Sequence, residues 1–287
     1  MSDLSETLPT NVTECRSSLL AGHLFVPIDL GFMSRLGHIE RGERECLSSA
    51  SIAIAGHVGP AARVIECGPF AGQIMAIVLN ALERPKAGVV MTTTLGPRQI
   101  ERLRETITTA EITHVDHNAT HAMWPLEPIG TGKTLVCVGG GGYGLLPPSQ
   151  ARATLDNASH SLQQGDFIAL TLEMNRDGAM IEATYREYGS QIIMQALASL
   201  GRVDGFDARI FYDAAKQRVR FGAMAQMGAS IAWNGTRVDF DAGAWLDLGA
   251  MTLHTPTTLL NLHPDFDVYD QWHSQDKVVT LLFLRKR

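Results

Sequence analysis

One acidic residue and one glycine stand at the end of the first strongly apolar run of the chain. The run spans residues 62–67 (ARVIEC), so that Glu66 lies near its carboxyl end and Gly68 follows it directly. In open α/β sheets ligands bind beyond the carboxyl ends of the strands, where a glycine lets a ligand approach the backbone. The dinucleotide fingerprint G-x-G-x-x-G is absent, because Phe70 stands where its second glycine would be. This pattern favours a ligand with an ammonium group and a ribose, such as S-adenosylmethionine, over NAD.

A second group of residues suited to ligand binding follows the predicted strand at 133–138. It is a run of four glycines that begins with Gly139 and Gly140 and leads into Tyr143. Two separate strand ends that carry such residues indicate a cleft at their common edge. We therefore expect flexible backbone and one aromatic ring beside Glu66.

Histidine and aspartate residues gather around the end of the third predicted strand, residues 111–116. His114, Asp116, His117 and His121 are numerous enough to suggest a metal centre. On a strand, however, His114 and His117 point to opposite faces, so that joint ligation would need a turn between them. We expect no metal here. Asp116 is better suited to accept the exocyclic amine of an adenine, with His117 beside it in the cofactor site.

Strands and helices alternate from Arg63 for about 140 residues, a rhythm typical of a parallel sheet with helices on both faces. After Gly205 the apolar residues alternate with a period of two, which predicts a smaller antiparallel unit that covers the substrate. The predicted fold class is therefore α/β with an antiparallel addition. We predict four segments, namely a helical N-terminal cap or lid (1–58), a cofactor-binding core (59–204), an antiparallel insert (205–250) and a helix and strand that return to the core (251–287).

The composition describes an ordinary globular chain. Its 287 residues are 45% hydrophobic, and 24 Lys and Arg against 30 Asp and Glu leave a net charge of −6. This acidic balance argues against a nucleic-acid partner. Apolar runs far shorter than ~20 residues and a polar N-terminus predict a cytoplasmic protein with no membrane partner. Four scattered cysteines without a C-x-x-C pair predict reduced structural thiols. We expect the partner to be a small-molecule substrate.

The order of these segments resembles the histidine-specific N-α-methyltransferase family, whose best-known member acts in ergothioneine biosynthesis. The resemblance runs from about Glu40 to the C-terminus. It implies a class I methyltransferase-like (Rossmann-like) fold with S-adenosylmethionine as cofactor. The family motifs fall on Arg41-Gly42-Glu43, Glu66 to Phe70, Met91 to Thr93, Val115 to His117, Gly139 to Pro147, Gly165 to Glu173, Thr184-Tyr185, Phe211 to Asp213 and Leu246 to Gly249.

The resemblance implies catalytic and binding roles for individual residues. Tyr185 and Tyr143 would position the nucleophile, and Glu173 or Asp247 would take a proton. Asp247, Tyr143 and Glu43 would contact the acceptor. The cofactor site would comprise Glu66, Gly68, Phe70, Thr92, Thr93, Asp116, His117, Gly139 and Gly140.

Several positions depart from the family pattern, and the aromatic pair near the R-x-E segment is missing, with His38 and Ile39 nearby instead. The acid that normally ends the second strand and holds the ribose is replaced by threonines, among them Thr92 and Thr93. Phe70 replaces a glycine, and its ring beside a sulfonium would be favourable by about 0.5 to 2 kcal/mol through cation–π attraction. Gly144 replaces the asparagine that would hold the amino group of the acceptor.

Three functions are compatible with this pattern. The first is methyl transfer from S-adenosylmethionine to a small amino-acid-like acceptor, for which the protein chiefly aligns the reactants and excludes water. In the second, the α-amine of the cofactor attacks its own aminocarboxypropyl carbon, giving azetidine-2-carboxylate and releasing methylthioadenosine. An external acceptor would make this second function an aminocarboxypropyl transfer. The third is a non-catalytic protein, either a sensor that binds an adenosine ligand or a structural partner that keeps the fold without the chemistry.

Overall fold

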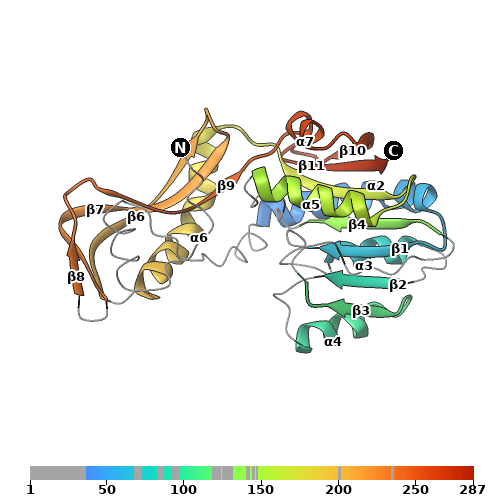
Figure 1. Cartoon of the computed structure of the whole chain (residues 1–287), viewed down its shortest axis with the longest axis horizontal. Coiled ribbons are helices and arrows are strands. Elements are labelled where there is room, and N and C mark those ends of the chain that lie inside the picture. The colour runs from blue at the N-terminus through green and yellow to red at the C-terminus, as the bar shows by residue number, and fades with distance from the viewer. Residues whose placement is uncertain are drawn as a thin grey trace. The chain divides into compact units, whose positions relative to one another are not determined.

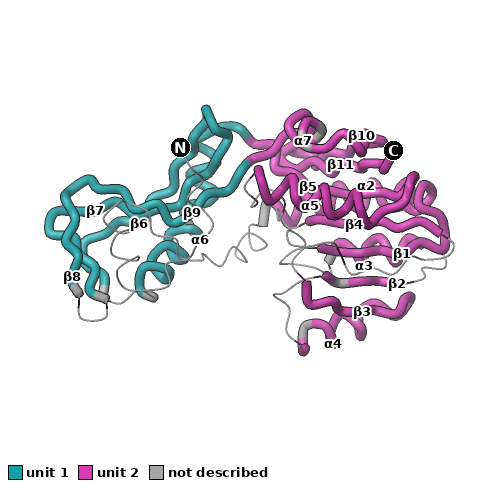
Figure 2. Tube along the Cα trace, in the orientation of Figure 1, with its two compact units in different colours: residues 1–32, 176–252 teal, residues 33–175, 253–287 magenta. Residues whose placement is uncertain are grey.

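The computed structural model (Figure 1) describes residues 37–67, 73–82, 87–91, 97–117, 124, 132–139, 143, 146, 148–199, 202–233 and 236–287. The chain divides into two compact units (Figure 2). Among the described residues, unit 1 comprises those within 176–252, and unit 2 comprises those within 37–175 and 253–287. The sequence analysis drew a boundary at 204, whereas the division in the structure falls after Asn175. The difference arises because helix α6 (Gly178–Ser199) packs on the antiparallel strands that follow it.

Unit 2 is built on a seven-stranded sheet with the order β10-β11-β5-β4-β1-β2-β3. β3, β2, β1, β4 and β5 run parallel, and β11 and β10 are antiparallel to their neighbours. All residues of β1 and β4 are buried, as in parallel strands covered on both faces. The strands are β1 (Arg63–Cys67), β2 (Ala87–Met91), β3 (Ile112–Val115), β4 (Thr134–Val138), β5 (Phe167–Glu173), β10 (Phe266–His273) and β11 (Val279–Lys286).

The strand order creates a switch point between β1 and β4. The chain leaves β1 for β2 and β3 on one side, and it then returns as β4 on the other side of β1. In open α/β sheets the crevice beyond the carboxyl ends of two such strands is the usual ligand site. The sequence prediction of a parallel α/β sheet with a second antiparallel sheet is confirmed.

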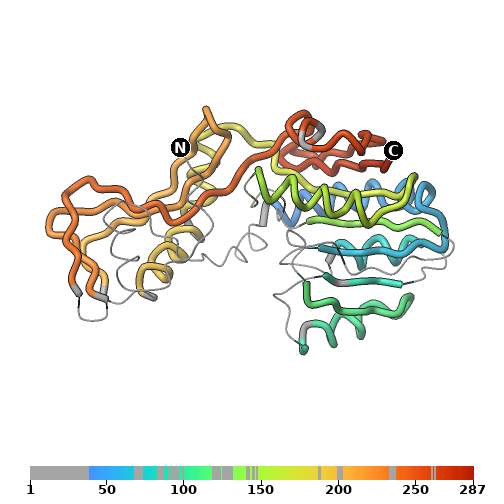
Figure 3. Tube along the Cα trace, in the orientation of Figure 1, coloured from blue at the N-terminus to red at the C-terminus, as the bar shows by residue number. Residues whose placement is uncertain are grey.

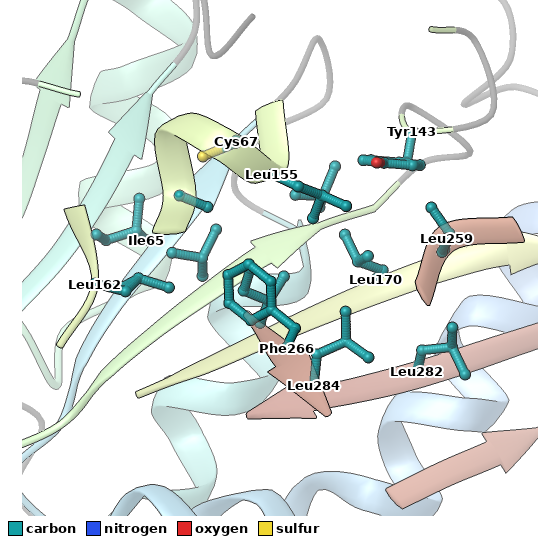
Figure 4. Close-up of a cluster of buried hydrophobic side chains, with 14 of the residues drawn as sticks. Ile65, Cys67, Tyr143, Leu155, Leu162, Leu170, Leu259, Phe266, Leu282 and Leu284 are labelled. Carbon is teal, nitrogen blue, oxygen red and sulfur yellow. The ribbon is translucent and has the colours of Figure 1, made fainter. Parts of the chain in front are cut away.

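Helices cover both faces of this sheet. Figure 1 shows α5 in front of the strands and α2 and α3 behind them. Leu155 of α5 joins Ile65, Leu170 and Leu282 of the sheet in one buried cluster (Figure 4). The helices of unit 2 are α2 (Gly37–Val58), α3 (Gln73–Ala81), α4 (Pro97–Thr106), α5 (Pro148–Ser161) and α7 (Pro256–Leu262).

The C-terminal strand completes the core of unit 2. β11 lies beside β5 although the two are far apart in the sequence (Figure 3). Phe283 of β11 stacks on Phe167 of β5 with ring centroids 4.5 Å apart and an interplanar angle of 7°. Both rings are buried. The antiparallel tail of the sheet therefore shares the apolar core with the parallel strands.

Unit 1 is a twisted antiparallel sheet with one long helix on it. β6 (Arg202–Asp213) pairs with β7 (Arg218–Trp233), and β8 (Thr236–Asp239) and β9 (Trp245–Thr252) both pair with β7. The buried residues Ile181, Tyr185, Ile193 and Leu197 form the apolar face of α6. Gly189 lets α6 approach the sheet, since a Cβ there would lie 2.5 Å from Cδ1 of Ile210. No helix of the described residues is both long enough and apolar enough to cross a membrane.

Truncation of Phe283 to alanine should lower the free energy of unfolding by about 3–5 kcal/mol, because a fully buried stacked ring would leave a cavity. The matched control is Val268→Ala on edge strand β10, where 37% of the residue is exposed. The control substitution should lower the free energy of unfolding by less than about 1 kcal/mol. Denaturant titration followed by circular dichroism measures both, and equal losses would contradict the interior placement of β11.

Candidate active site

Glu66 forms the centre of the carboxyl edge of the sheet. Only 2% of this residue is exposed. Its Oε2 accepts a hydrogen bond from the backbone N–H of Met75 at 2.8 Å, and its Oε1 accepts one from Ile74 at 3.4 Å. These amides lie in the first turn of α3, where a helix has unpaired N–H groups and a positive dipole end. The carboxylate therefore joins the end of β1 to the start of α3.

Gly139 lies directly after β4 and against the start of α3. A Cβ at this position would overlap the side chain of Ile74, and it would lie 3.6 Å from Oε1 of Glu43. The sequence analysis expected a ligand to require glycine here. In the structure the end of the Ile74 side chain fills the space beside Gly139, so that a larger residue here would require Ile74 to move.

Glu43 reaches the same edge from α2. The residue is buried, and its Oε1 accepts a short hydrogen bond from the hydroxyl of Thr171 in β5. Because Oε1 of Glu43 also lies near Gly139, the structure brings together three predicted residues, Glu43, Glu66 and Gly139, on adjacent elements. Two buried carboxylates at one edge favour a ligand with positive charge.

Asp116 and His117 follow β3 at the same edge. Asp116 is exposed and His117 is half-buried. β2 lies between β1 and β3, so that about 10 Å separates these residues from the end of β1 at the usual strand spacing. Polar side chains therefore lie at two places along the carboxyl edge of the sheet, at the end of β1 and after β3. The predicted residues Gly68, Phe70, Thr92, Thr93 and Gly140 lie outside the described residues.

Tyr143 occupies a different place from the one predicted. Its ring is fully buried in the apolar cluster of unit 2 (Figure 4). Its hydroxyl donates a hydrogen bond of 2.8 Å to the carbonyl oxygen of Ala151 in α5, and its ring meets His254 edge to face at 5.3 Å. Burial raises the pKa of the phenol well above its usual value. Tyr143 therefore anchors the segment after β4 to α5, and it does not present its hydroxyl to a ligand.

The remaining predicted residues are divided between the two units. Glu173 ends β5 in unit 2 and is half-buried. Tyr185 is fully buried on α6 in unit 1, where its ring meets Phe221 edge to face at 6.1 Å. Asp247, on β9 of unit 1, accepts a hydrogen bond of 2.6 Å from Nη2 of Arg220. The sequence analysis missed Arg220, because the register that pairs β7 with β9 cannot be read from the period-two pattern.

Metal and thiol chemistry receive no support among the described residues. No three of their His, Cys, Asp and Glu side chains are grouped so as to hold a metal ion. Cys46, Cys67 and Cys137 are free and buried. Burial raises the pKa of Cys46 to about 11 and raises those of the other two thiols further. These three thiols are protonated at neutral pH and belong to the core.

The chain is similar to known methyltransferases. The model of a family described as histidine-specific, S-adenosylmethionine-dependent methyltransferases matches residues 38–286. The CcbJ methyltransferase from Streptomyces caelestis is 10% identical, with 84% of this chain and 95% of that chain covered at a TM-score of 0.47. The 1,6-didemethyltoxoflavin-N1-methyltransferase of Burkholderia thailandensis is 12% identical, with 94% and 86% covered at a TM-score of 0.46. The N-methyltransferase NodS of Bradyrhizobium japonicum is 14% identical, with 90% and 98% covered at 0.43. Among curated proteins none matches the chain.

Replacement of Gly139 by alanine should weaken binding of S-adenosylmethionine about tenfold, because the new methyl group displaces the Ile74 side chain and crowds Oε1 of Glu43 at this edge. Isothermal titration calorimetry measures the affinity. Gly56→Ala is the matched control, since a Cβ on Gly56 of α2 meets nothing within 4 Å. If the Gly139→Ala variant binds S-adenosylmethionine as tightly as the wild type, the cofactor does not bind at this edge.

Proposed function

The chain belongs to the family of histidine-specific, S-adenosylmethionine-dependent methyltransferases, and we propose that it transfers the methyl group of this cofactor to a small amino-acid-like acceptor. The observation that carries the proposal is the buried carboxylate of Glu66, which orders the start of α3 at the switch point of the sheet. A small molecule is favoured as the acceptor because the chain carries a net charge of −6, which disfavours a nucleic-acid surface.

The residues at the carboxyl edge fit S-adenosylmethionine by their chemistry. The cofactor carries positive sulfonium and ammonium groups, and Glu43 and Glu66 supply buried negative charge at the end of the central strands. In this proposal Asp116 and His117 hold the adenosine at the far side of the edge, where an exposed carboxylate can accept hydrogen bonds from an exocyclic amine. The bound sulfonium makes the methyl group reactive without further activation.

The protein then has to align the acceptor and receive a proton. A neutral amine attacks the methyl group with its lone pair, and the resulting ammonium releases one proton. We assign this proton to Glu173, whose half-buried carboxylate ends β5 at the same edge as Glu66. Tyr143 and Tyr185 are packed in the cores of their units, so that we give them no part in this step.

Cleavage of the cofactor at its aminocarboxypropyl group is the alternative reaction. A closed pocket that folds the methionine chain of the cofactor, with rings from Phe70 and Tyr143 and with Gly144 in place of an acceptor-holding asparagine, would favour this reaction. Tyr143 lies in the apolar core, and Phe70 and Gly144 lie outside the described residues. Methyl transfer is therefore the function that we propose, and release of methylthioadenosine is an outcome that its test must detect.

Replacement of Glu66 by alanine should weaken binding of S-adenosylmethionine by about tenfold or more, because the first turn of α3 loses its acceptor. Glu66→Gln should retain part of the affinity, since its amide oxygen can still accept one of the two hydrogen bonds. Glu105→Ala, on the exposed side of α4, is the control. Calorimetry measures the affinities, and thermal denaturation shows that each variant is folded.

The reaction itself is tested with the wild-type chain, S-adenosylmethionine and amino acids offered one at a time. Mass spectrometry should detect S-adenosylhomocysteine together with a product heavier by one methyl group. Methylthioadenosine released from the cofactor alone, above the spontaneous rate, would contradict methyl transfer. Binding of the cofactor without turnover on any acceptor would favour the sensor function.

A further inference from the structure

Glu43 reaches the carboxyl edge of the sheet of unit 2 from a helix. It lies on α2, and only 8% of the residue is exposed. Figure 1 shows α2 and α3 on the same side of the sheet, and the two helices pack against each other. A carboxylate that is removed from water requires partners, since an isolated buried charge is costly. The contacts of Glu43 therefore indicate which group it can bind.

Glu43 shares one face of the sheet with Glu66 and Thr171. The neighbours of these two residues along their strands, Cys67 and Leu170, belong to the buried cluster on the α5 side (Figure 4). Because side chains alternate between the two faces of a strand, Glu66 and Thr171 face α2 and α3. Their hydrogen bonds agree with this placement, since Glu66 bonds α3 and Thr171 bonds Glu43 of α2.

The register of β4 and β5 places Thr171 beside Gly139. Val138, the last residue of β4, pairs with Leu170, so that Gly139 and Thr171 are the next residues of the two neighbouring chains. Oε1 of Glu43 accepts a short hydrogen bond from the hydroxyl of Thr171 and lies 3.6 Å from the place of a Cβ on Gly139. The carboxylate of Glu43 therefore lies level with the first residue after β4, at the switch point of the sheet.

The two carboxylates of this edge are held by different groups. Oxygens of Glu66 accept hydrogen bonds from backbone N–H groups in the first turn of α3, so that its charge faces the positive end of a helix dipole. Thr171 holds Glu43 with a neutral hydroxyl. This bond occupies one of about four acceptor positions of the carboxylate and neutralises none of its charge. Of the two carboxylates, Glu43 is better suited to bind a cation.

The strand order separates the two ends of the proposed cofactor site. In the proposed function Asp116 and His117, which follow β3, hold the adenosine. β2 and β1 lie between β3 and β4, so that about 14 Å separates the end of β3 from Gly139 at the usual strand spacing. The ammonium group of S-adenosylmethionine is at the opposite end of the molecule from the adenine. A cofactor that lies along the edge therefore directs its ammonium group toward Glu43.

We propose that Glu43 binds the ammonium group of S-adenosylmethionine and that Thr171 is a positioning residue, which holds this carboxylate beside the end of β4. Glu43 thereby selects ligands that carry the amino group over adenosine compounds that lack it. The sequence analysis placed Glu43 with the acceptor, and this inference places it with the cofactor instead. It rests on the proposed function, whose cofactor site it specifies.

The test is calorimetric titration of the full chain with S-adenosylhomocysteine and two analogues of it. In the deaminated analogue hydrogen replaces the ammonium group, and in the decarboxylated analogue hydrogen replaces the carboxylate. The wild-type chain should bind S-adenosylhomocysteine about tenfold or more tightly than the deaminated analogue, because the latter leaves Glu43 without its charged partner. The decarboxylated analogue, which keeps the ammonium group, should also bind more tightly than the deaminated one.

Replacement of Glu43 by glutamine should abolish the preference for the ammonium group. The affinity for S-adenosylhomocysteine should fall about tenfold or more, whereas the affinity for the deaminated analogue should stay within about threefold of the wild-type value. Glu40→Gln is the matched control, because Glu40 lies on the same helix and pairs with the exposed Arg44 at 2.6 Å. This control should keep the full preference.

Thr171→Val removes the hydroxyl and retains a side chain of similar size. It should reduce the preference for S-adenosylhomocysteine over the deaminated analogue by about threefold or more, because the carboxylate of Glu43 loses the donor that orients it. Thr171→Ser should restore the preference, since it restores the hydroxyl. A variant that binds the deaminated analogue as tightly as the wild type has a folded cofactor site.

The assignment of Glu43 and the proposed function fail separately. A full preference for the ammonium group in Glu43→Gln would show that another group binds it. An equal loss of affinity for S-adenosylhomocysteine and for the deaminated analogue would show that Glu43 only supports the structure of the edge. Either result would overturn the assignment. A wild-type chain that binds neither S-adenosylmethionine nor S-adenosylhomocysteine would instead contradict the proposed function.

Discussion

The carboxylate of Glu66 is the interaction on which the candidate site depends. It is buried at the end of a fully buried strand, where an isolated charge would be costly, and the first-turn amides of α3 compensate for that cost. Strand β1, helix α3 and the close packing of Ile74 on Gly139 are thereby fixed relative to one another. The carboxyl edge of the sheet is ordered by a hydrogen-bonded carboxylate in addition to apolar packing.

Much of the fold could be predicted from the sequence, because burial on both faces leaves continuous apolar runs such as 62–67 and 133–138. The positions of Glu66 and Asp116 at one edge follow from the same pattern. The role of Tyr143 could not be predicted, because an aromatic residue after a strand can point toward a ligand or into the core. In the structure its hydroxyl donates a hydrogen bond to the carbonyl oxygen of Ala151, which holds the ring in the core. The pairing of Arg220 with Asp247 depends on strand register and a bulge after Phe221, which the sequence does not encode locally.

The two units carry different sets of polar residues. Unit 2 carries the switch point and the buried carboxylates to which we assign the cofactor. Unit 1 carries the ion pair of Arg220 with Asp247 and the indole of Trp245 beside it. The family match shows that the chain is an S-adenosylmethionine-dependent methyltransferase by family, and the placement of the cofactor at this edge is our proposal.

The most direct test of the cofactor site is hydrogen exchange of the full chain with and without S-adenosylmethionine, measured by mass spectrometry of peptides. Exchange reports the opening of backbone hydrogen bonds, and a bound ligand slows it where it stabilises them. The account predicts slower exchange in residues 73–82 at α3 and in residues 112–117 at the end of β3. Binding of the cofactor that leaves both segments unchanged, while other segments become protected, would contradict the placement of the cofactor at the edge that Glu66 orders.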